Sequence, residues 1–494
     1  MACLKTQRRP IRHRRRPGGA GLRQIAPLPE WLVAIGRPER VIEALSRHVP
    51  ELATGALTLQ SCKIKHLGLD DDIGCWTGEY TCTIEGPAQR RSVQLRGILA
   101  PPGGGAPDSQ PSAVAFGAAG WRCYLPELRL ELQTRLPEPE LPALPLLTDP
   151  DQARALLEQS IRAGSPAYRD IRIQSCEPDM ARSHAAVRHV LRYKLAYPLD
   201  APAGHSWPPL VVAKTYDSDL GQNAYASMRA LWESPLRSSG VVTIAEPLAY
   251  MPELKILVQG PVREQQTLED MLETAIRSDS PAALDELQSF MQKAAAGLAA
   301  LHQSGVSYGR PFTWLDRLAQ ARAALAGLVR PLPEFARAVE PTLARLEARA
   351  AETPPDPAVP AHGAFRAAQV LIDHGQIGLI DFDGFCQAEP AMDLARFSAT
   401  AKDVGLEAAL GKADGDDPAT QELRLRRLLQ IEALCAAFTA QYEALAPVSR
   451  ERIALWEALN ILTLVMASWK KVKPARLRYT LLMLERLLSS NGLD

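Results

Sequence analysis

HGAFRAAQVLIDHGQIGLIDFDG, the segment from His362 to Gly384, decides how the rest of the sequence is interpreted. Two short apolar runs, at 370–372 and 377–380, flank a polar turn that contains a glycine. This pattern is typical of a β-hairpin. We therefore predict a hairpin that brings the polar residues before its first strand and the acidic pair Asp381 and Asp383 to the same end of a small ribbon.

The composition is ordinary for a globular protein. Of the 494 residues, 46% are hydrophobic and 23% are charged, and this length favours about three domains. No apolar run approaches the roughly 20 residues that span a bilayer. The eight cysteines are scattered, without CxxC pairs or zinc-ligand spacing, which favours free thiols in a reducing compartment. We expect a cytoplasmic protein without a membrane span.

The amino-terminal segment differs from the rest of the chain in charge. Residues 1–24 hold eight Lys or Arg residues and no acid, which leaves 48 basic and 56 acidic residues in the remainder. A basic segment of this kind suits nucleic acid or acidic lipid, but its Gly and Pro content favours a disordered tail. We assign no function to residues 1–27 and do not expect a nucleic-acid partner.

An internal repeat organises the first half of the sequence. Leu59-Gln60-Ser61-Cys62 recurs as Ile173-Gln174-Ser175-Cys176, and the ten residues from Tyr124 recur from Tyr250 with five identities. Two matches in the same order at similar offsets indicate duplication. Each copy reads as a helix followed by several antiparallel strands, which is an α+β unit.

The predicted helices of the two copies are residues 38–52 and 149–163, and Asp149-Pro150 supplies an N-cap and a proline at the first helical position of the second. A tyrosine follows each repeated cysteine at nearly equal distance, at Tyr80 and Tyr193.

A strand-like run comes next in each copy, Val93 to Arg96 in the first and Val211 to Lys214 in the second. Aligning these two runs places Arg96 where the second copy has Lys214. The Pro- and Gly-rich residues 100–111 form a predicted loop inside the first copy.

After Gln259 the pattern changes to long helices with apolar residues at three- and four-residue spacing. We predict helices over 268–278, 283–303, 315–328, 333–352, 421–445, 449–469 and 474–488, with the hairpin inserted among them.

The parts follow the order of protein-kinase-like phosphotransferases: a lysine on a strand, a hinge-like strand, a helical lobe, then a loop and hairpin that end in Asp. The chain most closely resembles the aminoglycoside phosphotransferase and choline-kinase-like branch, which reads His-Gly-Asp-x-x-x-x-Asn, Ile-Asp-[Phe/Trp]-[Asp/Glu] and Asp-Leu-Ala. The matching residues are His362 to Gln369, Ile380 to Asp383 and Asp393 to Ala395. The spacing agrees throughout, and two residues differ.

The resemblance covers residues 149–494 and reaches back to about residue 28 through the repeat. It implies an α+β, protein-kinase-like bilobal fold with an antiparallel-sheet amino lobe and a helical carboxyl lobe, preceded by a duplicated amino-lobe-like cap domain. The implied divisions are a basic tail at 1–27, the cap at 28–147, the amino lobe at 148–262 and the carboxyl lobe at 263–494.

The resemblance also implies where a nucleotide would bind. Lys214 would hold the α- and β-phosphates of ATP as a point charge. The hinge residues Gln259, Gly260 and Val262 would face the adenine ring, although Pro261 has no N–H to donate. The family pairs its lysine with a Glu on the next helix, and residues 221–232 contain no acid.

A second group of residues would hold Mg²⁺. Asp381 offers the hard carboxylate that this ion prefers, and Asp383 is placed to assist it. Gln369 takes the position of the family's metal-binding Asn, with the same amide oxygen on a longer side chain.

The catalytic loop carries the decisive difference. His362 resembles the family's loop-bracing histidine, and Asp393 is expected to cap a helix from Leu394 and to brace the same loop. Arg366 adds positive charge beside the site. Ala364 replaces the Asp that deprotonates the acceptor hydroxyl, and loss of a general base costs about 10²–10⁴-fold in rate.

We therefore predict a catalytically impaired relative, a pseudokinase in which binding of ATP and Mg²⁺ is weakened or lost. Two alternatives stay open. One is an active kinase for a small-molecule hydroxyl with a displaced base, either Asp383 or a residue supplied by the first repeat copy. The other is a scaffold that binds a protein partner and no nucleotide. The sequence names neither an acceptor nor a partner.

Overall fold

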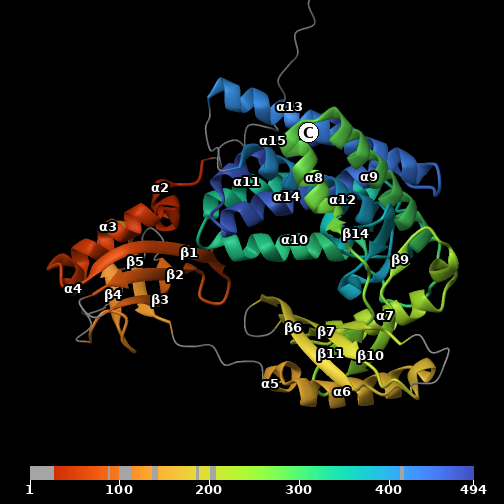
Figure 1. Ribbon diagram of the computed structural model, residues 1–494. Coiled ribbons are helices and arrows are strands. Elements are labelled where there is room, and N and C mark those ends of the chain that lie inside the picture. Colours follow the sequence, from red (N-terminus) through yellow and green to blue (C-terminus); the bar gives the residue numbers. More distant parts are fainter. Residues whose placement is uncertain are drawn as a thin grey trace, which may run out of the picture.

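The computed structural model describes residues 27–86, 89–99, 114–135, 143–184, 188–200, 207–411 and 417–493. The predicted basic tail, the loop at 100–111 and residues 185–187 lie outside these ranges. Three parts follow one another along the chain: a cap, an amino lobe and a large helical lobe (Figure 1). The predicted α+β, kinase-like bilobal fold is confirmed.

The cap consists of short helices packed on one face of a five-stranded antiparallel sheet of order β1-β2-β3-β5-β4. The predicted helix over 38–52 is divided, because Val49 is extended at φ −94° and ψ 116°. A residue that precedes a proline, here Pro50, disfavours the α conformation. The elements are α2 Glu30–Val33, α3 Pro38–His48, α4 Pro50–Ala53, β1 Thr58–Asp70, β2 Cys75–Glu85, β3 Arg90–Leu99, β4 Arg122–Leu125 and β5 Leu130–Thr134.

The amino lobe has a similar plan, with helix α6 packed on a five-stranded sheet of order β10-β11-β8-β7-β6. Asp149 is the N-cap of α6, as predicted, and its carboxylate accepts from the backbone N–H groups of Asp151 and Gln152. The elements are α5 Leu144–Thr148, α6 Pro150–Gly164, β6 Ser175–His184, β7 Arg188–Ala196, β8 Leu210–Thr215, α7 Leu220–Trp232, β10 Pro247–Met251 and β11 Ile256–Gln259.

The two sheets have the same strand order when α7 is left out, since β6, β7, β8, β10 and β11 take the places of β1 to β5. The repeated tyrosines make the same buried contact. The hydroxyl of Tyr80 donates to the carbonyl of Ile35 at 3.1 Å, and that of Tyr193 donates to the carbonyl of Leu147 at 3.0 Å. Each acceptor lies three residues before the helix that packs on its sheet.

The strand register corrects the alignment of Arg96 with Lys214. Tyr80 pairs with Leu95 on β3, and Tyr193 pairs with Val211 on β8. Counting from these pairs, the counterpart of Lys214 is Ile98. A shift of two residues keeps every side chain on the same face of a strand, so alternation of apolar residues alone does not reveal this error.

The sheet edges agree with the corrected alignment. Gln133 of β5 pairs with Arg96, and its repeat equivalent Gln259 pairs with Val212. Arg96 is therefore the counterpart of Val212. The turn before each of these strands contains a residue in the left-handed conformation, Arg129 at φ 52° and Lys255 at φ 51°.

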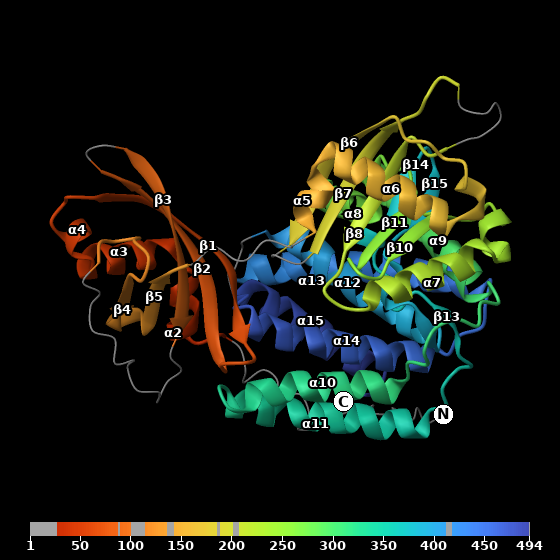
Figure 2. The same ribbon diagram turned by 90° about the horizontal axis from the view of Figure 1, so that it is seen from below.

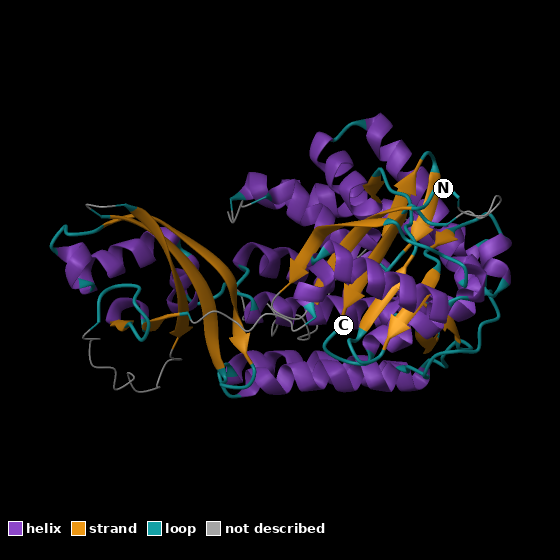
Figure 3. Cartoon of the chain, turned by 60° about the horizontal axis from the view of Figure 1, so that its bottom comes forward, coloured by secondary structure: helices purple, strands orange, loops and turns teal. Residues whose placement is uncertain are grey.

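The carboxyl lobe is a set of long helices around the hairpin (Figures 2 and 3). The predicted helices are present with ends that differ by no more than three residues, and an eighth, α12, begins three residues before the expected Leu394. The helices are α8 Leu268–Ser278, α9 Pro281–His302, α10 Trp314–Val329, α11 Pro333–Glu352, α12 Ala391–Leu410, α13 Pro418–Glu443, α14 Arg450–Lys470 and α15 Pro474–Ser490. None of the described helices is long and apolar enough to cross a membrane.

The predicted hairpin is confirmed as β14 (Val370–Asp373) and β15 (Gln376–Leu379). Its two turn residues, His374 and Gly375, both have positive φ angles of 45° and 82°, as a two-residue type I′ turn requires. The hairpin lies in a four-stranded sheet between β12 (Gln266–Thr267) and β9 (Thr243–Ile244). A separate pair, β13 (Val359–Ala361) and β16 (Cys386–Ala388), frames the segment.

The cap contacts the helical lobe through the turn between β1 and β2. Lys470 Nζ, at the end of α14, lies 2.8 and 2.9 Å from the two carboxylate oxygens of Asp71. The buried apolar residues of the cap and of the helical lobe form one continuous cluster, whereas α6 and its sheet enclose a separate core.

Candidate active site

The hairpin places Asp381 beside the amino lobe. Asp381 follows β15 with φ 74°, a left-handed conformation that is uncommon for residues other than glycine, and it precedes a short 3₁₀ turn at Phe382–Gly384. Its carboxylate accepts a hydrogen bond from Lys214 Nζ at 3.0 Å and another from Gln369 Nε2 at 3.1 Å. Lys214 lies 167 positions earlier in the chain, so this contact joins the two lobes.

The electrostatics of this contact keep Asp381 ionised. Burial raises the pKa of the carboxyl group, but the charge of Lys214 and the hydrogen bonds from Lys214 and Gln369 outweigh burial and lower the pKa to about 2. A carboxylate that is charged at neutral pH and partly buried is the kind of ligand that a divalent cation takes.

A close backbone contact joins the loop to the hairpin. Gly363 has φ +79°, and a Cβ atom there would lie 1.8 Å from the carbonyl oxygen of Gly384. Only glycine fits this position, because the clash would be with backbone. The contact fixes Ala364 and the residues after it against the turn that carries Asp381.

Asp393 braces the same loop from helix α12. Its carboxylate accepts from the backbone N–H groups of His362 at 2.7 Å and Gly363 at 3.0 Å, and His302 Nε2 lies 3.2 Å away. The expectation that Asp393 caps the helix is wrong, because the N-cap is Pro390 and Asp393 lies within the first turn. Burial raises the pKa of Asp393, but the bond to His302 and the nearby histidines and backbone donors lower it overall.

His362 contacts the hairpin through its ring. The ring is fully buried, and Nε2 lies 3.0 Å from the carbonyl oxygen of Ile380. Burial lowers the pKa of His362 and outweighs the attraction of Asp393 and Asp381, so the ring is neutral at pH 7. A neutral ring that donates to a backbone carbonyl is suited to bracing the loop.

A cleft of about 800 Å³ lies where the two lobes meet, and Asp381 is part of its wall. Of the predicted site residues, seven line this cleft: Lys214, Gln259, Val262, Arg366, Gln369, Asp381 and Asp383. Three do not: Gly260, His362 and Ala364. The backbone N–H of Gly260 donates to the carbonyl of Glu246 at 2.8 Å and so is directed away from the cleft.

Sequence reasoning missed three residues around the cleft. The hydroxyl of Tyr216 donates to Asp383 Oδ1 at 2.8 Å. Asn223, on α7, donates to the carbonyl oxygens of Asp383 and Phe385, each at 3.2 Å. His189 is 5% exposed in the cleft wall, and its ring nitrogens have no hydrogen-bond partner among the described residues.

The contacts of Lys214 and α7 differ from the lysine–glutamate pair that the resemblance implied. The sequence of α7 contains no acid, and Asn223 on that helix contacts the backbone of the Asp383 turn instead. Lys214 pairs with Asp381 directly. The absence of an acid in α7 was the one signal in the sequence that pointed to a different arrangement.

Residues 222–426 match the model of the phosphotransferase enzyme family. The predicted resemblance is confirmed. The matched region contains the whole segment from His362 to Gly384, Asp393 and most of the helical lobe, but it does not extend over Lys214 or the cap.

Similar solved structures include kinases for small molecules. A choline/ethanolamine kinase family protein from Mesorhizobium loti is 14% identical, with 69% of this chain and 96% of that chain covered and a TM-score of 0.43. A choline kinase from Cryptosporidium parvum is 12% identical, with 69% of this chain and 97% of that chain covered and a TM-score of 0.43. A spectinomycin phosphotransferase in complex with ADP and spectinomycin is 11% identical, with 70% of this chain and 99% of that chain covered and a TM-score of 0.39. No curated protein sequence matches the chain.

Proposed function

We propose that this protein binds a nucleotide such as ATP, with Mg²⁺, in the cleft between its lobes, and that it transfers phosphate poorly or not at all. The observation that carries the proposal is the pair of Lys214 and Asp381. A cation suited to phosphate and an anion suited to metal meet at 3.0 Å in the wall of a cleft of about 800 Å³. The family match over 222–426 supports the same activity class.

The chemistry of the residues present fits a bound magnesium ion. Mg²⁺ is held in such sites by one or two carboxylates, with phosphate oxygens and water completing its shell. Asp381 supplies a carboxylate that is ionised at neutral pH. The Oε1 atom of Gln369 is buried without a hydrogen-bond partner among the described residues, and a buried amide oxygen of this kind is a candidate ligand. When bound, the ion would neutralise charge on the phosphates.

The chain's own residues would do the remaining work. Lys214 would hold phosphate oxygens as a point charge, and the hinge residues Gln259 and Val262 would contact the adenine ring of the nucleotide. Asp383 would support the ion only in part, because Tyr216 already donates to one of its oxygens.

The site lacks the general base that phosphate transfer to a hydroxyl requires. Ala364 lies in the loop where the family's general base is expected, and it has no acid–base group. Asp383 is the alternative that the sequence suggested, but its hydrogen bond from Tyr216 at 2.8 Å directs the carboxylate toward the amino lobe. We infer that catalysis is impaired by this loss, within the typical range of about 10²–10⁴-fold for a general base.

We extend the proposal to location and partners. The cysteines described are all free thiols, including Cys62 and Cys82, whose sulfur atoms lie 3.9 Å apart across β1 and β2. Unlinked thiols at this separation suit a reducing cytoplasm. The partner bound beside the nucleotide would be a small molecule.

The test is to measure nucleotide binding and turnover on the same preparations. Calorimetric titration of the wild-type chain with ATP and Mg²⁺ should show saturable binding, and Asp381→Asn should weaken the Mg²⁺-dependent part of it. Steady ATP turnover should be absent or slow. Rapid turnover that Asp381→Asn abolishes would contradict impairment, and absence of any ATP binding would favour the scaffold alternative.

A further inference from the structure

The cap contains a cavity of about 720 Å³ that the proposed function does not use. Its wall includes Thr77 and Glu79 of β2, Arg96 of β3, Arg122 of β4 and Gln133 of β5. We call this cavity the cap pocket. Its volume lies within the range of about 300–1,000 Å³ that is usual for small-molecule sites.

The strand register places four of these side chains in one row across the sheet. Glu79 pairs with Arg96, Arg96 pairs with Gln133, and Gln133 pairs with Arg122. Residues that lie directly opposite each other in an antiparallel pair share a face of the sheet, with Cβ atoms about 5 Å apart. The residues that precede and follow the row along β3 and β5 are more buried, because they face the helices of the cap. The row therefore lies on the face that is directed away from these helices.

The amino lobe has its nucleotide cleft at the equivalent place. In the corrected alignment of the repeat, the counterparts of Arg96 and Gln133 are Val212 and Gln259. Both counterparts line the cleft between the lobes. The duplicated sheet thus has a cavity on the same face and at the same register in both copies.

The residues that differ between the two copies indicate different ligands. The cap has Ile98 in the place of Lys214, and it has Arg96 in the place of Val212. The nucleotide cleft has its positive charge at the end of the strand, whereas the cap pocket has it in the middle of the sheet face. The cap pocket is therefore not expected to hold a nucleotide in the way that the cleft does.

Positive charge predominates in the cap pocket. Its lining contains three arginines, Arg96, Arg122 and Arg135, but the single carboxylate of Glu79. Arg135 pairs with Glu79 at 2.8 Å, and Arg96 pairs at 3.1 Å with Asp70, which lies outside the lining. The side chain of Arg122 has no hydrogen bond or ion pair to any residue that the structure describes. An excess of positive charge in a cavity attracts anions.

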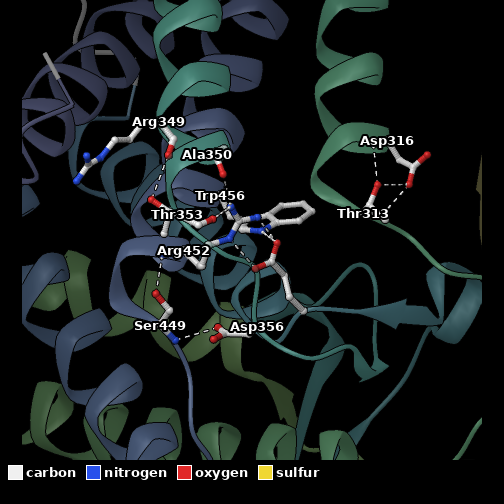
Figure 4. Close-up of polar contacts among 10 residues, drawn as sticks. Thr313, Asp316, Arg349, Ala350, Thr353, Asp356, Ser449, Arg452 and Trp456 are labelled. Carbon is white, nitrogen blue, oxygen red and sulfur yellow. Dashed lines mark hydrogen bonds and ion pairs between the residues drawn. The ribbon is translucent and has the colours of Figure 1, made fainter.

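Arg452 of α14 shows how an arginine with a structural role is placed (Figure 4). It is 2% exposed, and its guanidinium donates to Glu389 at 2.7 Å and to the carbonyl of Thr353 at 3.2 Å. Trp456 donates to the same carboxylate. The side chain of Arg96, in contrast, is 45% exposed. Because a guanidinium has five N–H donors, Arg96 has donors left for a ligand beyond its bond to Asp70.

We propose that the cap pocket binds a small organic anion through Arg96 and Arg122, at a site separate from the nucleotide cleft. Guanidinium groups bind carboxylate and phosphate groups through paired hydrogen bonds. The two arginines flank Gln133, so their Cα atoms are two strand spacings, about 10 Å, apart. A small molecule with two anionic groups spans this separation. The site does not depend on nucleotide binding in the cleft.

The experiment is calorimetric titration of the full chain without Mg²⁺, with citrate as the carboxylate probe and, separately, pyrophosphate as the phosphate probe. The proteins are the wild type, Arg96→Gln, Arg122→Gln, Lys214→Ala and the control Arg90→Gln. Arg90 is an exposed residue on the same strand as Arg96 and lies outside the cap pocket. An even separation along a strand places both arginines on the same face, so the control removes the same charge from the same surface.

We expect the wild type to bind at least one of the two anions saturably, and the anion that binds more tightly identifies the group that the site prefers. Arg96→Gln and Arg122→Gln should each weaken this binding about 10- to 100-fold, the usual effect of losing a hydrogen bond to a charged group. Arg90→Gln and Lys214→Ala should leave it unchanged.

Three results would overturn the proposal. The first is a wild type that binds neither anion, and the second is unchanged affinity in either Arg96→Gln or Arg122→Gln. The third is loss of anion binding in Lys214→Ala, which would assign the anion to the nucleotide cleft. Melting curves without ligand exclude misfolding as the cause of weaker binding. Arg122→Gln should melt as the wild type does, because the Arg122 side chain makes no bond within the described part of the chain.

Discussion

The cap and the amino lobe present the same five-stranded sheet in two different settings. In the amino lobe, β8 ends in Lys214, and this lysine reaches across to Asp381 of the helical lobe at 3.0 Å. In the cap, the equivalent position on β3 is Ile98, and the neighbouring Arg96 pairs with Asp70 of its own sheet at 3.1 Å. The same sheet thus occurs with a candidate nucleotide site in the amino lobe and without one in the cap. The amino lobe differs from the cap in having a lysine at the end of β8 and the hairpin opposite it.

The cap contacts the helical lobe differently as well. It meets that lobe through the turn at Asp71, which Lys470 contacts. We propose that the cap arose by duplication of the amino lobe and lost the phosphate-binding position. Four experiments test this comparison, in order of decreasing expected effect.

The largest expected effect concerns Ala364, in the catalytic loop of the helical lobe. If this site lacks only a base, Ala364→Asp should raise ATP hydrolysis, with water as the acceptor, by up to about 10²–10⁴-fold. Coupled-enzyme detection of ADP measures the rate. Ala364→Asn, which fills the same space without an ionisable group, is the matched control. A gain in the Asn variant equal to that in the Asp variant would show that the effect is not acid–base chemistry.

The next effect compares the two buried tyrosines. Tyr80→Phe and Tyr193→Phe each remove one hydroxyl that donates to a buried carbonyl in equivalent positions. Each should lower the free energy of unfolding of its own part by roughly 1–3 kcal/mol, because the acceptor is left unsatisfied. Hydrogen exchange resolved along the chain separates the parts. Very different losses at the two sites would weaken the structural equivalence.

The third effect is a pH dependence of the contact between the amino lobe and the helical lobe. The folded pKa of Asp381 is about 2, below the roughly 3.9 of an unfolded Asp. Its contribution to stability is therefore present above about pH 4 and is lost as the pH falls through about 2. Acid titration of melting temperature should show this loss in the wild type and a smaller one in Asp381→Asn. Identical profiles for the two proteins would count against the Lys214–Asp381 pair.

The smallest effect concerns the contact between cap and helical lobe. Lys470→Met removes the ion pair with Asp71, a carboxylate that is 61% exposed. Exposed pairs contribute about 0–1 kcal/mol, so the melting temperature should change little, and less in high salt. A large loss, measured by calorimetry, would mean that this pair and not the shared apolar cluster holds the cap.

The features that could be predicted from the sequence are those that depend on residues close together in the chain. The hairpin turn at His374-Gly375, the Asp149 cap and the long amphipathic helices are specified by residues close in the chain, and all are present. The alignment of Arg96 with Lys214 failed because alternation of buried and exposed residues is unchanged by a shift of two. The bonds from Tyr216 and Asn223 to the Asp383 turn could not be predicted, since each joins residues at least 160 positions apart.

The measurement that tests the central claim most directly is the thermal shift produced by ATP and Mg²⁺ in the wild type, Lys214→Ala and Arg96→Ala. At a ligand concentration 100 times its dissociation constant, binding should stabilise the wild-type chain by about 2.7 kcal/mol. The account predicts that Lys214→Ala abolishes this shift and that Arg96→Ala, on the equivalent sheet of the cap, retains it. A shift that survives Lys214→Ala, or one that depends on Arg96, would contradict the assignment of the nucleotide to the amino lobe's cleft.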